Sequence, residues 1–216
     1  MKVLITAGPT YERIDPVRFI GNYSSGKMGL ALAAECVRRG MEVSLVLGPV
    51  SIDHEVLHNP NVKLTRVESA AEMFDATVAQ FAGCNAALLC AAVADFTPVA
   101  CADKKIKREG DELVIRLKPT QDIAAHLGSM KTERQVLAGF ALETNDENLN
   151  AHKKLEKKNF DFIVLNSLND EGAGFRYDTN KITIIDRKEQ TTFPLLSKQE
   201  CAINIIDHLC HLLKTC

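Results

Sequence analysis

The sequence has no apolar run that approaches the roughly 20 residues needed to span a bilayer, so we expect no transmembrane segment. The N-terminal run contains one lysine and is ended by Gly8 and Pro9, too early for a signal peptide. There is no excess of positive charge, since the formal net charge is -2. A general nucleic-acid binder is therefore not indicated, and any anion site must be a local cluster.

Paired cysteine motifs are also missing. The seven cysteines include no C-x-x-C pair and no spacing typical of metal ligands. An odd number without an export signal predicts reduced thiols in a cytoplasmic protein. Cys36 and Cys90 stand in apolar runs and are expected to pack as small hydrophobic residues.

Most of the sequence consists of short apolar runs that alternate with helical patterns. This alternation predicts an α/β fold, a Rossmann-like three-layer sandwich around a mainly parallel sheet. The expected strands are Val3 to Ala7, Val43 to Leu47, Val62 to Val67, Ala86 to Ala91, Val136 to Ala141 and Phe162 to Leu165.

The expected helices have recognisable ends. The first spans Lys27 to Arg39 and stops at Gly40. Capping-box pairs predict three more helix starts. These pairs are Ser69 with Glu72, Thr144 with Glu147, and Ser197 with Glu200. The second of these helices is rich in lysine and ends near Lys158, and the third carries a long apolar stripe.

Two regions interrupt the alternation. Residues 96–119 predict an excursion that turns at Gly110 and Asp111 and ends in a strand. Residues 169–193 predict a glycine-bearing loop followed by a C-terminal β-hairpin region. Because no linker or repeat is present, we expect residues 1–216 to form one domain.

The connection between the first strand and the first helix is unusually long, since such loops ordinarily have about 2–6 residues. It follows the carboxyl end of a strand, where open α/β sheets place their ligands. Its last part brings Ser24, Ser25, Gly26 and Lys27 to a helix N-terminus. Free backbone N–H groups and the helix dipole there favour a phosphate.

Two other motifs match this connection only in part. Gly21 to Lys27 fits G-x-x-x-x-G-K, but Met28 replaces the hydroxyl residue that holds magnesium in a P-loop. Tyr23 and Lys27 have the Y-x-x-x-K spacing of short-chain dehydrogenases. The glycine fingerprint of dinucleotide-binding folds is missing after the first strand, which argues against a reductase.

ITAGPTYERIDPVRFIGNYSSGKMG resembles the opening signature of phosphopantothenoylcysteine synthetases. CAAVADF around Asp95, KIKR from Lys105, GFALET from Gly139 and the later DFIVLNS resemble further blocks of that family, in family order over nearly the whole chain. The first block and KIKR are closest to the bacterial, CTP-dependent branch. Many bacterial members carry a flavin-dependent decarboxylase domain upstream.

This resemblance implies a cytoplasmic ligase of coenzyme A biosynthesis and a homodimer. It joins 4′-phosphopantothenate to L-cysteine, uses CTP as co-substrate with Mg²⁺, and proceeds through an acyl-cytidylate. No motif identifies the magnesium ligands. Neither nucleic acid nor a membrane is an expected partner.

The resemblance also implies residue roles. Asn22 matches the asparagine that acts on the acyl-cytidylate, Arg18 an arginine near the same substrate, and Lys105 the lysine of a lid over the nucleotide. The implied nucleotide contacts are Ser24, Ser25, Gly26, Lys27, Ala92, Asp95, Lys105, Gln121, Asp122, Ile123, Ala124, Phe140, Lys154 and Lys158.

Other interpretations remain open for these residues. Relatives have Asn-Pro where this chain has Thr120 and Gln121, which leaves the Gln121 contact open, and Phe140 also fits a core position. An NAD(P)-dependent reductase and a non-catalytic nucleotide sensor are the alternatives for the whole chain. A sensor would need the pocket but neither Asn22 nor Lys105.

Overall fold

A central sheet of eight strands organises the computed structural model, which describes residues 1–108, 110, 112–143, 147–167, 174 and 177–214. The strand order is β12-β11-β10-β9-β6-β1-β4-β5. Neighbours from β10 to β5 pair in parallel, whereas β11 and β12 are antiparallel. The strands are β1 (Lys2–Ala7), β4 (Glu42–Leu47), β5 (Val62–Arg66), β6 (Ala86–Leu89), β9 (Val136–Glu143), β10 (Phe162–Ser167), β11 (Thr179–Asp186) and β12 (Gln190–Ser197).

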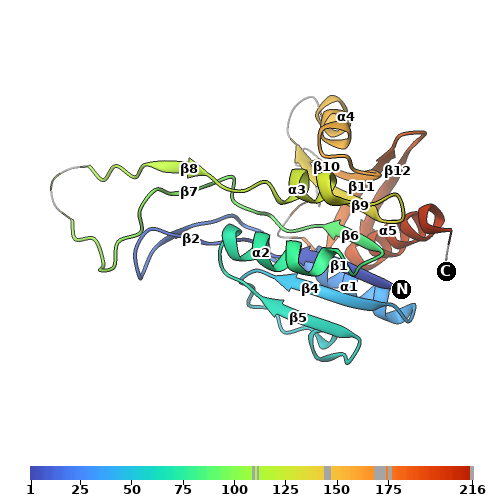
Figure 1. Cartoon of the computed structure of the whole chain (residues 1–216), viewed down its shortest axis with the longest axis horizontal. Coiled ribbons are helices and arrows are strands. Elements are labelled where there is room, and N and C mark those ends of the chain that lie inside the picture. The colour runs from blue at the N-terminus through green and yellow to red at the C-terminus, as the bar shows by residue number, and fades with distance from the viewer. Residues whose placement is uncertain (109, 111, 144–146, 168–173, 175–176, 215–216) are drawn as a thin grey trace.

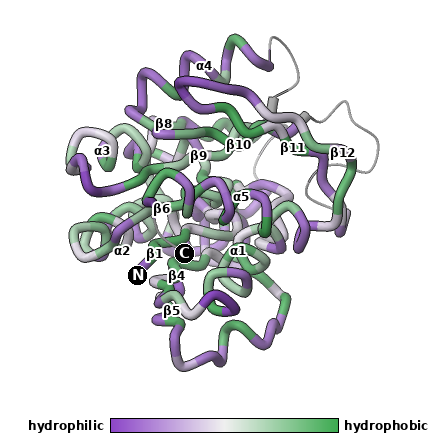
Figure 2. Tube along the Cα trace, turned by 90° about the vertical axis from the view of Figure 1, so that its right-hand side faces the viewer, coloured by the Kyte–Doolittle hydropathy of each residue, from purple (hydrophilic) through white to green (hydrophobic). Residues whose placement is uncertain are grey.

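Helices cover both faces of this sheet, and Figure 2 shows them on its two sides. One apolar core lies under α1 (Lys27–Arg38) and α5 (Lys198–Leu213). The other lies under α2 (Ala70–Phe81), α3 (Ile123–Met130) and α4 (Glu147–Lys157). A short 3-10 helix spans Glu55–His58. The predicted three-layer α/β sandwich is therefore confirmed.

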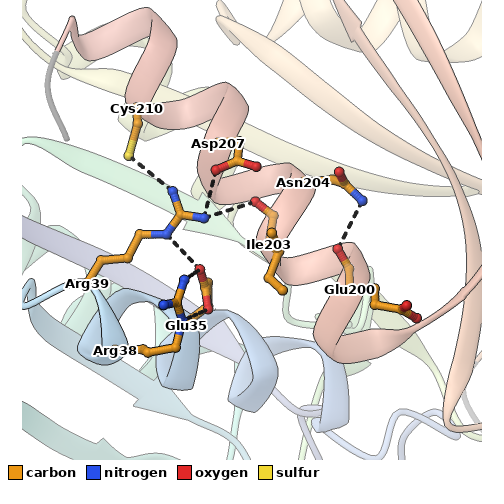
Figure 3. A network of polar contacts seen from close by, with 8 residues as sticks. All are labelled: Glu35, Arg38, Arg39, Glu200, Ile203, Asn204, Asp207 and Cys210. Carbon is orange, nitrogen blue, oxygen red and sulfur yellow. Dashed lines mark hydrogen bonds and ion pairs between the residues drawn. The ribbon is translucent and has the colours of Figure 1, made fainter.

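Ion pairs link the two helices of the first layer (Figure 3). The buried Glu35 carboxylate accepts hydrogen bonds from Arg38 and Arg39. Arg39 also pairs with Asp207 of α5, with 2.7 Å between Nη2 and Oδ1. This network joins the C-terminal end of α1 to the middle of α5.

The predicted helix ends are confirmed where the structure describes them. Gly40 follows α1 with a φ of 75°, a left-handed conformation that favours glycine. The Ser69 hydroxyl accepts from Glu72 N, and the capping box of Ser197 and Glu200 is complete. Thr144, the remaining predicted cap, lies outside the described residues, as does the predicted turn residue Asp111.

Two aspects differ from the sequence prediction. No helix was expected over α3, whose eight residues are too few to show a strong helical period. The excursion at residues 96–119 contains β7 (Phe96–Pro98) and β8 (Leu117–Pro119), a short antiparallel pair at its base. The predicted closing strand is therefore only three residues long. None of the described helices combines the length and apolar character needed to cross a bilayer.

We call residues 96–119 the arm, and Figure 1 shows its described residues extending away from the sheet beside β2 (Glu12–Arg13). β2 pairs with β3 (Phe19–Ile20) in the long connection after β1. Backbone Ala102 N donates to Ile14 O at 3.0 Å, so the arm is hydrogen-bonded to this connection. The connection thus has structure of its own.

Candidate functional site

A cavity of about 470 Å³ lies at the carboxyl ends of the parallel strands. Thr6 at the end of β1, Leu89 at the end of β6 and Leu142 of β9 line it. The chain order of the strands reverses between β1 and β6, and open α/β sheets bind ligands at that switch point. The cavity therefore occupies the place where this fold class binds its ligands.

The N-terminus of α1 forms one wall of the cavity. Gly26 precedes the helix with a φ of 76° and supplies no side-chain cap, so the first backbone N–H groups remain available for a ligand. Gly29 lies against β1, where an added Cβ would come within 2.3 Å of the Ala7 side chain. Together these glycines let the helix start pack closely on the sheet and face an anion.

Asn22 joins this wall to the switch point. Its Nδ2 donates to Ala92 O at 2.5 Å, and its Oδ1 accepts from Ser24 N at 3.0 Å. Ala92 also pairs with Pro9 just beyond the ends of β6 and β1. Asn22 does not itself line the cavity, but it holds two segments that do.

Lys154 and Lys158 reach the cavity from α4 and the residue after it. Lys158 pairs with the carboxylate of Asp122, whose other oxygen accepts from Ala125 N and caps α3. Burial lowers the pKa of the Lys158 ammonium, and the nearby Asp95 carboxylate opposes that shift. The ammonium is thus partly desolvated beside the cavity, which strengthens its attraction for a bound anion.

Lys27 and Lys198 reach the cavity from the opposite helical layer. Lys27 Nζ pairs with Asp178 Oδ1 at 2.5 Å. Lys198 is only 5% exposed, and burial together with the charge of Lys27 lowers its pKa. The sequence analysis missed Lys198, because a lysine in the first turn of a capped helix has the pattern of an exposed residue.

Two asparagines that the sequence analysis also missed line the cavity. Asn180 is 2% exposed, and its Oδ1 accepts from Gly174 N at 3.4 Å. Asn166 Oδ1 is buried and has no hydrogen-bond partner among the described residues. A buried polar atom without a partner is costly, so it suits a site that a polar ligand completes.

Cys90 lines the cavity as well and is half-buried, whereas Cys36 is fully buried as predicted. Burial raises the pKa of the Cys90 thiol to about 12, so it stays protonated near neutral pH. Phe140 lines the cavity and packs against the core, so both interpretations of this residue hold.

The structure brings most of the predicted nucleotide contacts to this one cavity. Those that line it are Ser24, Ser25, Gly26, Lys27, Ala92, Asp95, Gln121, Asp122, Ile123, Ala124, Phe140, Lys154 and Lys158. Residues separated by more than 100 positions in the sequence thus share a single site.

Arg18 and Lys105 do not line the cavity. Arg18 pairs with Asp15 and donates to Ile106 O at 2.9 Å, which ties the arm to the connection after β1. The Arg18 guanidinium holds the pKa of the buried Asp15 carboxyl well below its usual range. Lys105 is exposed on the arm beside this anchor.

Comparison with known proteins identifies a matching family and several similar proteins. The family model of the DNA/pantothenate metabolism flavoprotein C-terminal domain matches residues 1–213. A cysteine/cysteine sulfinic acid decarboxylase from an unknown prokaryotic organism is 56% identical over 206 residues, which are 95% of this chain and 56% of that protein. The coenzyme A biosynthesis bifunctional protein CoaBC of Vibrio vulnificus is 43% identical over 209 residues, 96% of this chain and 51% of its own.

Solved structures agree with these relatives. The crystal structure of the C-terminal domain of coenzyme A biosynthesis bifunctional protein CoaBC is 39% identical, with a TM-score of 0.83, and the match covers 99% of this chain and 95% of that one. The chain spans about half the length of the curated relatives it matches. Since the family model covers nearly all of it, the chain belongs to the DNA/pantothenate metabolism flavoprotein C-terminal domain family.

Proposed function

We propose that this chain is a phosphopantothenate–cysteine ligase of coenzyme A biosynthesis, that CTP activates its substrate, and that it acts in the cytoplasm. The observation that carries the proposal is the cavity at the switch point, which combines the glycine-rich start of α1 with lysines from both helical layers. The likeness to the CoaBC C-terminal domain along almost the whole chain supports the same activity.

The reaction has two balanced steps. The carboxylate of 4′-phosphopantothenate attacks the α-phosphorus of CTP, which forms an acyl-cytidylate and releases pyrophosphate. The amine of L-cysteine then attacks the acyl carbon, the amide forms as one proton is lost, and CMP leaves. Activation is needed because a free carboxylate is a poor electrophile, and the site must stabilise negative charge in both steps.

Asn22 is suited to the second step. Its amide lies at the switch point between Ala92 and Ser24, where it is held by two hydrogen bonds. We assign Nδ2 as a donor to the acyl oxygen as negative charge develops there, in exchange for its bond to Ala92 O. Asp95, at the cavity edge, is the candidate contact for the ribose or base.

Arg18, in the connection after β1, and Lys105, on the arm, do not line the cavity of their own chain, and we propose that they act at the cavity of the second copy in a homodimer. The arm and its neighbouring segment expose large apolar side chains that a second copy of the chain would cover. These are Val17, Phe19, Phe96, Val99, Leu113, Val114 and Leu117. Sedimentation equilibrium at micromolar concentration tests this association, and a monomer mass would contradict it.

Mg²⁺ is the proposed metal, and it would neutralise charge on the phosphate oxygens when bound. The triphosphate would supply much of the coordination itself, because the two carboxylates that line the cavity, Asp95 and Asp122, are assigned to the ribose or base and paired with Lys158, respectively. Carboxylate, phosphate and water oxygens are the ligands that magnesium prefers.

The test is pyrophosphate release from purified protein with Mg²⁺ and 4′-phosphopantothenate, with CTP compared with ATP and with cysteine present or omitted. CTP-selective release, with CMP and a cysteine adduct when cysteine is present, is the expected result. If a folded sample releases no pyrophosphate with either nucleotide, a reductase or a nucleotide sensor would be favoured instead. If the wild-type protein shows no turnover, nucleotide binding that survives substitution of Asn22 and Lys105 would favour the sensor.

A further inference from the structure

Lys198 is a buried cation at the edge of the cavity. Its side chain is 5% exposed, and it lines the cavity together with Lys27 and Asn180. Its ammonium donates to Gly174 O at 3.1 Å and also to Tyr177 O. These carbonyl oxygens accept hydrogen bonds, but they carry no net negative charge.

The positive charge of Lys198 is not matched by a nearby carboxylate. No carboxylate of the described residues lies within 4.0 Å of its ammonium. Asp178 lies close enough to influence it, but that carboxylate pairs directly with Lys27. An uncompensated buried charge is costly, which explains the lowered pKa and suits a position that an anionic ligand completes.

Lysines therefore line the cavity from both helical layers. Lys154 and Lys158 belong to the layer of α4, whereas Lys27 and Lys198 belong to that of α1 and α5. The layer of Lys27 and Lys198 also supplies the free N–H groups of the α1 N-terminus. A pyrophosphate carries several negative charges, so two cations and a helix start form a suitable set of partners.

We infer that Lys198, with Lys27, binds the two terminal phosphates of the nucleotide and then the pyrophosphate that leaves in the first step. The two carbonyl bonds hold the ammonium in place, and an ammonium has a third donor for a phosphate oxygen. The inference rests on the proposed function, because that reaction supplies the pyrophosphate.

Calorimetric titration of inorganic pyrophosphate in the presence of Mg²⁺ tests this assignment without any turnover. Lys198→Gln removes the charge but keeps an amide that can donate to the two carbonyls. Lys188→Gln is the matched control, since Lys188 is exposed in the turn between β11 and β12. We expect affinity for pyrophosphate to fall about tenfold or more in Lys198→Gln and to stay within about twofold in Lys188→Gln.

Equal affinity for pyrophosphate in wild type and a folded Lys198→Gln protein would overturn the inference, as would a wild-type protein that binds no pyrophosphate.

If Lys198→Gln does not fold, acetylation of wild-type lysines followed by mass spectrometry replaces it. Pyrophosphate should then protect Lys198 and leave Lys188 unprotected, and equal modification with and without pyrophosphate would refute the assignment. If the wild-type protein ligates its substrates but Lys198→Gln binds pyrophosphate with unchanged affinity, only this inference is wrong. If the wild-type protein binds pyrophosphate through Lys198 but does not ligate its substrates, only the proposed function is wrong.

Discussion

The ion-pair network between α1 and α5 should contribute measurably to stability (Figure 3). Glu35 and Arg39 have side chains that are 7% and 17% exposed, and 2.6 Å separates Glu35 Oε1 from Arg39 Nε. Exposed ion pairs contribute about 0–1 kcal/mol, whereas breaking a fully buried pair costs about 3–5 kcal/mol. This pair lies between these cases, so we expect Glu35→Gln to lower the free energy of unfolding by about 2 kcal/mol.

Urea unfolding followed by far-ultraviolet circular dichroism measures this change, because the chain has no tryptophan to report by fluorescence. For a chain of this length the melting temperature should fall by about 4–8 °C. Arg38→Met is the control, since Arg38 contacts the same carboxylate but is 66% exposed, and it should cost less than Arg39→Met. A Glu35→Gln and Arg39→Met double-mutant cycle with coupling within about 0.3 kcal/mol of zero would refute this account.

The same pair predicts a dependence on pH. The Arg38 and Arg39 guanidinium groups lower the pKa of Glu35 in the folded state. The stability that this carboxylate contributes is therefore fully present above its unfolded pKa of about 4.3 and is lost as the pH falls through the lower folded value. The difference in unfolding free energy between wild type and Glu35→Gln should shrink below about pH 4.3.

Three further predictions concern the proposed reaction. Asn22→Asp should still release pyrophosphate but should form the cysteine adduct about 100-fold more slowly, so that acyl-cytidylate accumulates in quenched samples; normal product formation would contradict the role of the amide. Lys105→Gln should slow pyrophosphate release about 100-fold and leave the melting temperature nearly unchanged, because the side chain is exposed; wild-type release would remove Lys105 from the first step. Lys154→Ala combined with Lys158→Ala should weaken nucleotide binding about tenfold or more in a titration, and unchanged affinity would make these lysines an ordinary solvated surface.

The sequence alone determined most of the secondary structure, because its signals are local. Short continuous apolar runs predict the parallel strands, and the cap at Ser197 with Glu200 depends on residues only three apart. The start of α1 was also predictable, since glycine, serine and lysine at a helix N-terminus indicate an anion site whatever surrounds them. The short helix α3 was missed, because eight residues give too little periodicity.

The tertiary structure decided which residues share the cavity and which do not. Lys198 has the local pattern of an exposed first-turn lysine, but packing of α5 against the sheet buries it beside Lys27, about 170 residues away in the chain. Lys105 looks like a site lysine in the sequence but lies on the arm, outside the cavity. Burial and charge compensation depend on contacts between distant segments, and no periodicity or motif along a single stretch of chain contains them.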